Sequence, residues 1–219
     1  MAEPAPATDL SDLEPDVSHL TTEDDEPVDN FYQDKQMDIL TEALRVSWPE
    51  GRPFLSASDV GIFYAVKEAV VPDVLLSVGV EVPEDFMEKN RRSYFMWLFG
   101  KPPEVVIEVV SNRQGGEETE KYAIYAQIKV PYYVIYDPQR LLSQRPLRIF
   151  QLSGASYVEK VDRQFPELGL GLTVWSGLYD GIRADWLRWT DGQGLMLETG
   201  PERAERAERE TDQERQRAD

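Results

Sequence analysis

The chain of 219 residues contains no cysteine and a single histidine. The absence of cysteine excludes disulfide bonds, thiolate metal sites and cysteine nucleophiles, and it fits the reducing cytoplasm, where we expect the protein to act. The one histidine, His19, lies in a segment too poor in large apolar residues to bury it. It therefore has no environment in which to serve as a ligand or a general base.

Long apolar runs are absent as well. The longest apolar and aromatic run, YFMWLF at 94–99, is far shorter than the roughly 18–20 residues that a membrane-spanning helix needs. The chain begins MAEPAPATDLSD, without the basic and apolar regions of a secretory signal. We therefore expect a soluble protein with no membrane partner.

Basic residues are scarce in both terminal segments. Residues 1–28 contain nine acids and no Lys or Arg, and residues 191–219 contain nine acids and five arginines. The whole chain has a net charge of −18, of which only −5 belongs to residues 29–190. We predict a disordered acidic leader at 1–28, one domain at 29–190 and a charged, helical tail at 191–219. A mildly acidic domain does not support tight DNA binding through electrostatics alone.

Apolar periodicity within the domain predicts an α/β fold. The predicted elements are a helix at 31–47 begun by Asp29 or Asn30, strands at 54–58, 60–66, 72–78, 104–110 and 130–138, a helix at 117–128, and a hairpin of strands at 147–152 and 157–161. The strand, helix and strand in the middle of the chain indicate a right-handed crossover, so 104–110 and 132–136 should lie parallel. We expect a mixed central sheet flanked by helices.

Three further expectations complete the predicted fold. The inward stripe of the first helix should consist of Phe31, Tyr32, Ile39, Leu40 and Leu44. Residues 79–103 should leave the sheet edge, with YFMWLF as a short packed helix or strand. The tryptophan-rich segment at the end of the domain should add a C-terminal β-hairpin that closes the sheet. In the tail, Glu202 with Arg206 and Glu205 with Arg209 should form ion pairs four residues apart.

Glu108 is the first candidate for chemistry, because it interrupts the otherwise apolar strand EVVIEVV. Alternation places it on one face of the strand with Val106 and Val110. Burying an unpaired carboxylate costs several kcal/mol, so a buried glutamate is usually paired, protonated or bound to a metal. The alternative is that this face is solvated and Glu108 points to water.

Asp73 and Lys121 are the groups that could join Glu108. Asp73 opens the strand at 72–78, and if that strand neighbours 104–110, both carboxylates can converge on one Mg²⁺ ion. Alternatively, Pro-Asp is only a common entry from a turn into a strand. Lys121 lies on the helical face of Ile124, Tyr125 and Ile128, which should pack on the sheet. It either has an anionic partner there or extends to solvent at the rim.

These segments, in this order, resemble a known family. PDV at 72–74, EVVIEVVS at 104–111, a helix carrying EKYAIYA and the phrase VPYYVIYDP are similar to the Uma-two family of restriction endonucleases, a branch of the PD-(D/E)xK nuclease superfamily. The likeness runs over most of 31–190. It implies a restriction-endonuclease-like fold and a catalytic set of Asp73, Glu108 and Lys121. Of these, Asp73 and Glu108 would bind Mg²⁺, for which Mn²⁺ can substitute.

The resemblance has one departure and some weaker implications. The superfamily's lysine usually lies two residues after the glutamate, where this chain has Val110, and Lys121 on the following helix is the residue that matches within the branch. Tyr125 would orient that lysine or line the groove. Arg91, Arg92 and Arg113 are candidate phosphate contacts.

The implied function is Mg²⁺-dependent hydrolysis of DNA phosphodiester bonds by an endonuclease with DNA as its partner. The alternative is a catalytically degenerate nuclease-fold module that binds or regulates, which Val110 and the low positive charge favour. A scaffold that binds another protein through YFMWLF and the tail is a third reading. A homodimer is left open.

Overall fold

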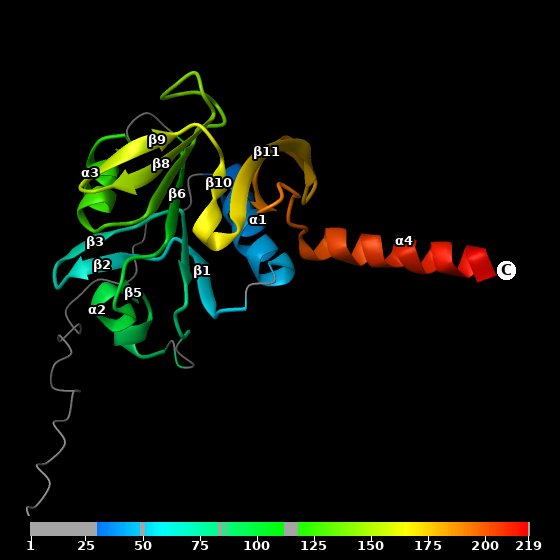
Figure 1. The fold of residues 1–219 in the computed structure, drawn as a ribbon, viewed down its shortest axis with the longest axis horizontal. Coiled ribbons are helices and arrows are strands. Elements are labelled where there is room, and N and C mark those ends of the chain that lie inside the picture. The colour runs from blue at the N-terminus through cyan, green and yellow to red at the C-terminus, as the bar shows by residue number, and fades with distance from the viewer. Residues whose placement is uncertain (1–29, 49–50, 83–84, 86, 112–117, 219) are drawn as a thin grey trace, which may run out of the picture.

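The centre of the molecule is a mixed sheet of six strands (Figure 1). The strands lie in the order β1 (Phe54–Ser58), β4 (Val74–Val78), β6 (Val105–Val109), β7 (Tyr132–Tyr136), β8 (Leu147–Ser153) and β9 (Ser156–Lys160). This computed structural model describes residues 30–48, 51–82, 85, 87–111 and 118–218. The predicted leader at 1–28, with His19, lies outside the described residues.

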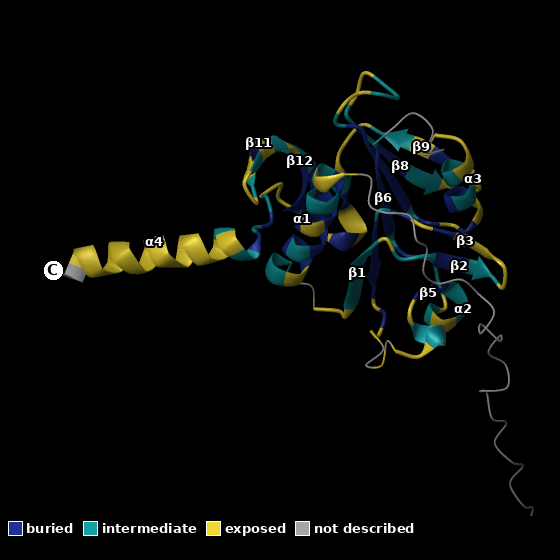
Figure 2. Ribbon diagram, turned by 180° about the vertical axis from the view of Figure 1, so that it is seen from behind, coloured by how far each residue is buried: buried dark blue, intermediate teal, exposed yellow. Residues whose placement is uncertain are grey.

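The strand pairing confirms the predicted crossover. β6 and β7 are parallel, with Glu108 opposite Ile135, and helix α3 (Glu120–Gln127) connects them. The other pairs of this sheet, including β4 with β6, are antiparallel. All five residues of each of β4, β6 and β7 are buried, because both faces of the sheet are covered. Figure 2 shows these strands in the colour of buried residues.

Helix α1 (Phe31–Ser47) covers one face of the sheet. It begins at Asn30, whose side chain accepts a hydrogen bond from the backbone N–H of Gln33, as expected of an N-cap residue. Ile39 and Leu40 are buried as predicted, and so is Leu44. Phe31 is 85% exposed, so the prediction that it joins the inward stripe was wrong: in the first turn it is Tyr32, the next residue, that contacts the sheet, through Tyr136 of β7.

A second, small sheet lies beside the first. It contains β3 (Glu68–Val70), β2 (Ile62–Ala65) and β5 (Tyr94–Phe95), in that order. The YFMWLF run is both of the predicted forms, since its first two residues form β5 and the rest form the one-turn helix α2 (Met96–Phe99). A short 3₁₀ turn, η2 (Lys89–Arg91), precedes it.

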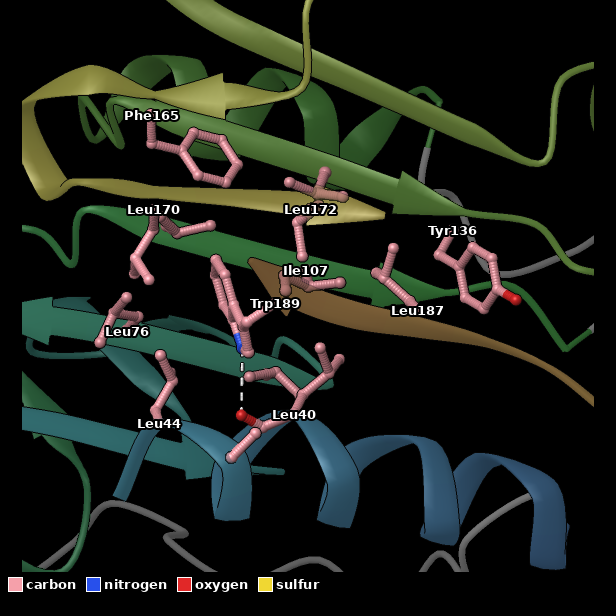
Figure 3. Packing of buried hydrophobic residues seen from close by; sticks show 14 of the residues in the cluster. Leu40, Leu44, Leu76, Ile107, Tyr136, Phe165, Leu170, Leu172, Leu187 and Trp189 are labelled. Atoms are coloured by element: carbon pink, nitrogen blue, oxygen red, sulfur yellow. Dashed lines mark hydrogen bonds between the residues drawn. The ribbon is translucent and has the colours of Figure 1, made fainter. Parts of the chain in front are cut away.

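The C-terminal hairpin is present as predicted, but it forms a sheet of its own, so the prediction that it closes the central sheet was wrong. β11 (Leu170–Tyr179) and β12 (Ile182–Asp191) pair along their full length, and β10 (Gln164–Phe165) adds a third strand beyond a short 3₁₀ turn, η3 (Pro166–Leu168). This sheet packs on α1. Residues of the C-terminal sheet, of α1 and of the central sheet form one hydrophobic core (Figure 3). Trp189 is fully buried there and donates its indole N–H to the carbonyl of Leu40 at 3.0 Å. Alternation of side chains fixes which face is buried, but not which sheet a strand joins.

Helix α4 (Gly200–Ala218) projects from the domain and is mostly exposed (Figures 1 and 2). Its first turn is bound to the domain, because the buried guanidinium of Arg188 donates to both carboxylate oxygens of Glu202, at 3.0 and 2.6 Å. Glu202 also accepts from the backbone N–H of Thr199, as in a capping box. Glu202 is thus engaged by Arg188, and the predicted pair with Arg206 was wrong. No helix in the described part of the chain has the length and apolar character needed to cross a membrane.

Replacing Glu202 with alanine should destabilise the protein by about 2–3 kcal/mol, because the Arg188 guanidinium would stay buried without its counter-ion. The measurement is the free energy of unfolding from urea denaturation. Glu205, three residues further along α4, is exposed, so the matched change Glu205→Ala should alter stability by less than about 0.5 kcal/mol. Equal effects of the two substitutions would contradict a structural role for the Arg188 ion pair.

Candidate functional site

Two carboxylates face each other across neighbouring strands. In the antiparallel pair of β4 and β6, Val74 lies opposite Ile107, so Asp73, directly before β4, comes opposite Glu108. Opposite residues of an antiparallel pair point to the same face of the sheet. Here it is the face that α3 covers. The convergence of Asp73 and Glu108 that the sequence suggested is therefore what the pairing produces.

Glu108 is buried in the middle strand, with only 1% of its surface exposed. Two donors from α3 bind it: the hydroxyl of Tyr125 donates to Oε1 at 2.7 Å, and the ammonium of Lys121 donates to Oε2 at 2.7 Å. The face shared with Val106 and Val110 is buried as well, so the alternative of a solvated face was wrong.

Lys121 reaches Glu108 from the edge of the site. Its side chain is 26% exposed, and its ammonium also donates to the carbonyl of Val71 at 3.2 Å. Lys121 lies one turn before Tyr125 on α3, and Tyr125 is fully buried. The ammonium thus has an anionic partner and keeps access to solvent. Val110 stands where the superfamily lysine usually lies, and it is an apolar, buried residue of the core under α3.

Asp73 is half-buried and receives two hydrogen bonds. The amide of Gln33, in the first turn of α1, donates to Oδ1 at 3.2 Å, and the backbone N–H of Val109 donates to Oδ2. The Val109 contact follows from the strand pairing, while the Gln33 contact brings a third element to the site. Each carboxylate oxygen keeps a second lone pair that could bind a cation.

Burial raises the pKa of both carboxyl groups, and repulsion by Asp73 adds to the shift of Glu108. Burial, followed by the negative charge of Asp73, raises the pKa of Glu108 to about 8, although Lys121 and Tyr125 oppose that rise. Burial raises the pKa of Asp73 to about 6, against the effect of the Val109 N–H and of Lys121. Burial, followed by the neighbouring Glu108 carboxylate, raises the pKa of the Tyr125 phenol well above its usual range, so this group stays a donor. Because the pKa values of both groups are raised, a cation bound by the two carboxylates would compete with protons.

The residues present fit a hard divalent cation. Asp73 and Glu108 offer only oxygen, and within the described ranges no group of three or more His, Cys, Asp or Glu side chains is arranged to hold a metal. Mg²⁺ is the metal that such a sparse set suits, because it binds through one or two carboxylates and retains several waters. In addition, Oε1 of Gln33 is buried next to Asp73 and has no donor among the described residues.

The predicted arginines are not brought to the carboxylates. Arg91 pairs with Glu88 at 3.5 Å and lines a cavity together with Gly79 and Leu98. That cavity lies beyond the C-terminal end of β4. Asp73 lies before the other end of this strand, about 17 Å away along the strand. Arg92 donates to the carbonyl of Met87 at 3.1 Å. Arg113 lies outside the described residues.

Two contacts at the site differ from the sequence analysis. Tyr125 was expected to orient Lys121 or to line a groove, but it binds Glu108 itself. Gln33 was not predicted at all. Its sequence signal was Asn30 three residues earlier, a spacing typical of a capping box, which would turn the Gln33 side chain back to the helix start. In the structure that side chain points to Asp73 instead.

The chain is similar to a protein family and to a solved structure. The model of the Uma2 family, described as "Putative restriction endonuclease", matches residues 26–178. Among solved structures, one described as a "putative nuclease belonging to DUF820" from Anabaena variabilis ATCC 29413 is similar, with a TM-score of 0.45 and 10% sequence identity. The similarity covers 63% of this chain and 72% of that one. No curated protein matches the chain.

In metal-free buffer, Glu108 should make the folded state less stable as pH rises. Its ordinary pKa is 4.5 and its pKa in the folded protein is about 8, so the folded state binds the proton more tightly. The stability that the folded state gains by binding this proton is fully present below the ordinary pKa. It is lost as pH rises through the pKa of Glu108 in the folded protein. Between about pH 5 and 8, the free energy of unfolding of the wild type should fall relative to Glu108→Gln by more than about 1.4 kcal/mol.

Urea denaturation of both proteins at a series of pH values measures this difference. Asp73 titrates in both proteins, so the difference between them reports on Glu108 together with its interaction with Asp73. Parallel curves for the two proteins would show that Glu108 does not titrate abnormally.

Proposed function

The chain belongs to the Uma2 family of restriction endonucleases, and from that premise we propose that it is a Mg²⁺-dependent endonuclease that hydrolyses phosphodiester bonds in DNA. The observation that carries the proposal is the meeting of Asp73, Glu108 and Lys121, which come from three different elements and lie far apart in the sequence. A carboxylate pair beside a lysine supplies groups that hydrolysis of a phosphodiester can use: oxygen ligands for a cation and a positive charge for the phosphate.

Each side chain has a role that its contacts define. Asp73 and Glu108 would hold the cation through the lone pairs that their present donors leave free. When bound, Mg²⁺ supplies Lewis-acid polarisation of the phosphoryl oxygen and lowers the pKa of a bound water. Lys121 would steady the attacking water and the negative charge that develops on the phosphate, since its ammonium lies at the solvent-exposed edge of the site. Tyr125 holds Oε1 of Glu108 and so fixes the direction of the carboxylate.

Val110 supports a second candidate, a nuclease-fold module that binds DNA or regulates without cleaving it. A site that had lost the lysine would lack the positive charge for the phosphate. Lys121 argues for activity, because its ammonium lies 2.7 Å from Oε2 of Glu108. The positive charge is therefore retained, although α3 supplies it in place of the strand. A cytoplasmic location and a homodimer stay predictions.

The test is cleavage of supercoiled plasmid and of single-stranded circular DNA by the purified full-length chain, with Mg²⁺ or Mn²⁺. The substitutions Glu108→Gln and Lys121→Met should each lower the cleavage rate at least about 100-fold, because one removes a charged metal ligand and the other a charge that stabilises the transition state. The matched control is Lys129→Met. Lys129 follows α3 and is exposed, and its ammonium donates to the carbonyl of Gly154, so this variant should cleave like the wild type.

The outcomes separate the two candidate functions. A wild type that binds Mn²⁺ and DNA but cleaves neither substrate would establish the binding module. Cleavage by Glu108→Gln at the wild-type rate would show that the assignment of the catalytic groups is wrong.

A further inference from the structure

Two glutamines of α1 lie one turn apart, and both are buried, with 8% of Gln33 and 0% of Gln36 exposed. The amide of Gln36 is satisfied at both ends by one residue of β12: Nε2 donates to the carbonyl of Leu187 at 2.9 Å, and Oε1 accepts from the Leu187 N–H at 2.8 Å. The amide of Gln33 is satisfied at one end only. Its Nε2 donates to Asp73, and its Oε1 is buried without a donor from the described part of the chain.

The orientation of the Gln33 amide is fixed by its neighbour. Asp73 offers only acceptors when ionised, so the amide must present its N–H₂ group to Oδ1. Exchanging the two ends of the amide would set its oxygen against a carboxylate oxygen. The backbone of Gln33 is held as well, since its N–H donates to the Asn30 side chain at 2.9 Å. The unpartnered oxygen is therefore held in place beside Asp73.

A buried amide oxygen without a donor is rare in folded proteins and calls for an explanation at the place where it occurs. Here the place is the pair of carboxylates proposed to hold a divalent cation. Two carboxylates leave most positions of a six-coordinate Mg²⁺ ion to water, and such waters can donate hydrogen bonds. Asp59 lies within electrostatic range of Asp73, but within the described ranges no third His, Cys, Asp or Glu is placed to hold a metal with Asp73 and Glu108.

We infer that Gln33 is a positioning residue of the metal site: Nε2 holds Asp73, and Oε1 accepts a hydrogen bond from a water of the cation that Asp73 and Glu108 bind. This inference rests on the proposed metal site and adds to it a third element of the fold, the first turn of α1. Gln36 has no such role, because its amide is wholly used in joining α1 to β12.

The experiment is calorimetric titration of Mn²⁺ into the full-length wild type and four variants. Gln33→Met keeps the length of the side chain and removes both polar ends, so the affinity for Mn²⁺ should fall about 10-fold, as for other residues that support metal ligands. Gln33→Glu restores an oxygen without the N–H₂ group, and its affinity should equal or exceed that of the wild type. Gln36→Met should lower the thermal midpoint and leave the Mn²⁺ affinity unchanged. Glu108→Gln should abolish binding.

The outcomes distinguish the inference from the proposed function. If Glu108→Gln abolishes binding but Gln33→Met binds like the wild type, the metal site stands and the role of Gln33 is overturned. If Gln33→Glu binds as weakly as Gln33→Met, the glutamine acts only by holding Asp73, and the role of Oε1 is overturned. If the wild type binds no Mn²⁺, the metal site itself fails, and the inference fails with it. Thermal midpoints of all variants show that each is folded.

Discussion

The arrangement of the site depends on one buried carboxylate and the helix that binds it. Glu108 lies in the middle strand of the central sheet, where an unpaired negative charge would cost several kcal/mol. Tyr125 and Lys121, one turn apart on α3, each donate to one of its oxygens. These two hydrogen bonds fix where α3 packs along β6. The helix that connects β6 to β7 therefore also positions the side chains around Glu108.

This carboxylate is poorly explained as a device for stability. A buried ion pair recovers little more than the cost of removing its charges from water, and apolar residues of similar volume often stabilise a core better. Asp73 opposite Glu108 adds repulsion, which together with burial raises the pKa of Glu108. Each carboxyl thus lies in surroundings that a divalent cation would improve. Buried titratable groups with shifted pKa values that cost the protein stability are typical of a functional site.

Much of this could be predicted from the sequence, and the limits have physical causes. Alternation along β6 gave the face of Glu108, and the chain order of strand, helix and strand gave the parallel pair, because both are local consequences of backbone geometry. The separate C-terminal sheet and the ion pair of Arg188 with Glu202 were not predicted. Both depend on which distant surface an element meets, and periodicity carries no information about that choice. Gln33 was missed for the same reason, since its partner Asp73 is 40 residues away.

The C-terminal sheet also helps to position the site, although its residues lie far from Asp73 in the chain. Gln36 is bonded at both ends of its amide to Leu187, and the indole of Trp189 bonds to the carbonyl of Leu40, so β12 holds α1 at two successive turns. The same helix presents Gln33 to Asp73. Hydrogen bonds therefore connect β12 through α1 to Asp73. Glu108 is fixed by α3 from one side, and Asp73 is fixed from the other by a helix that the C-terminal sheet holds in place.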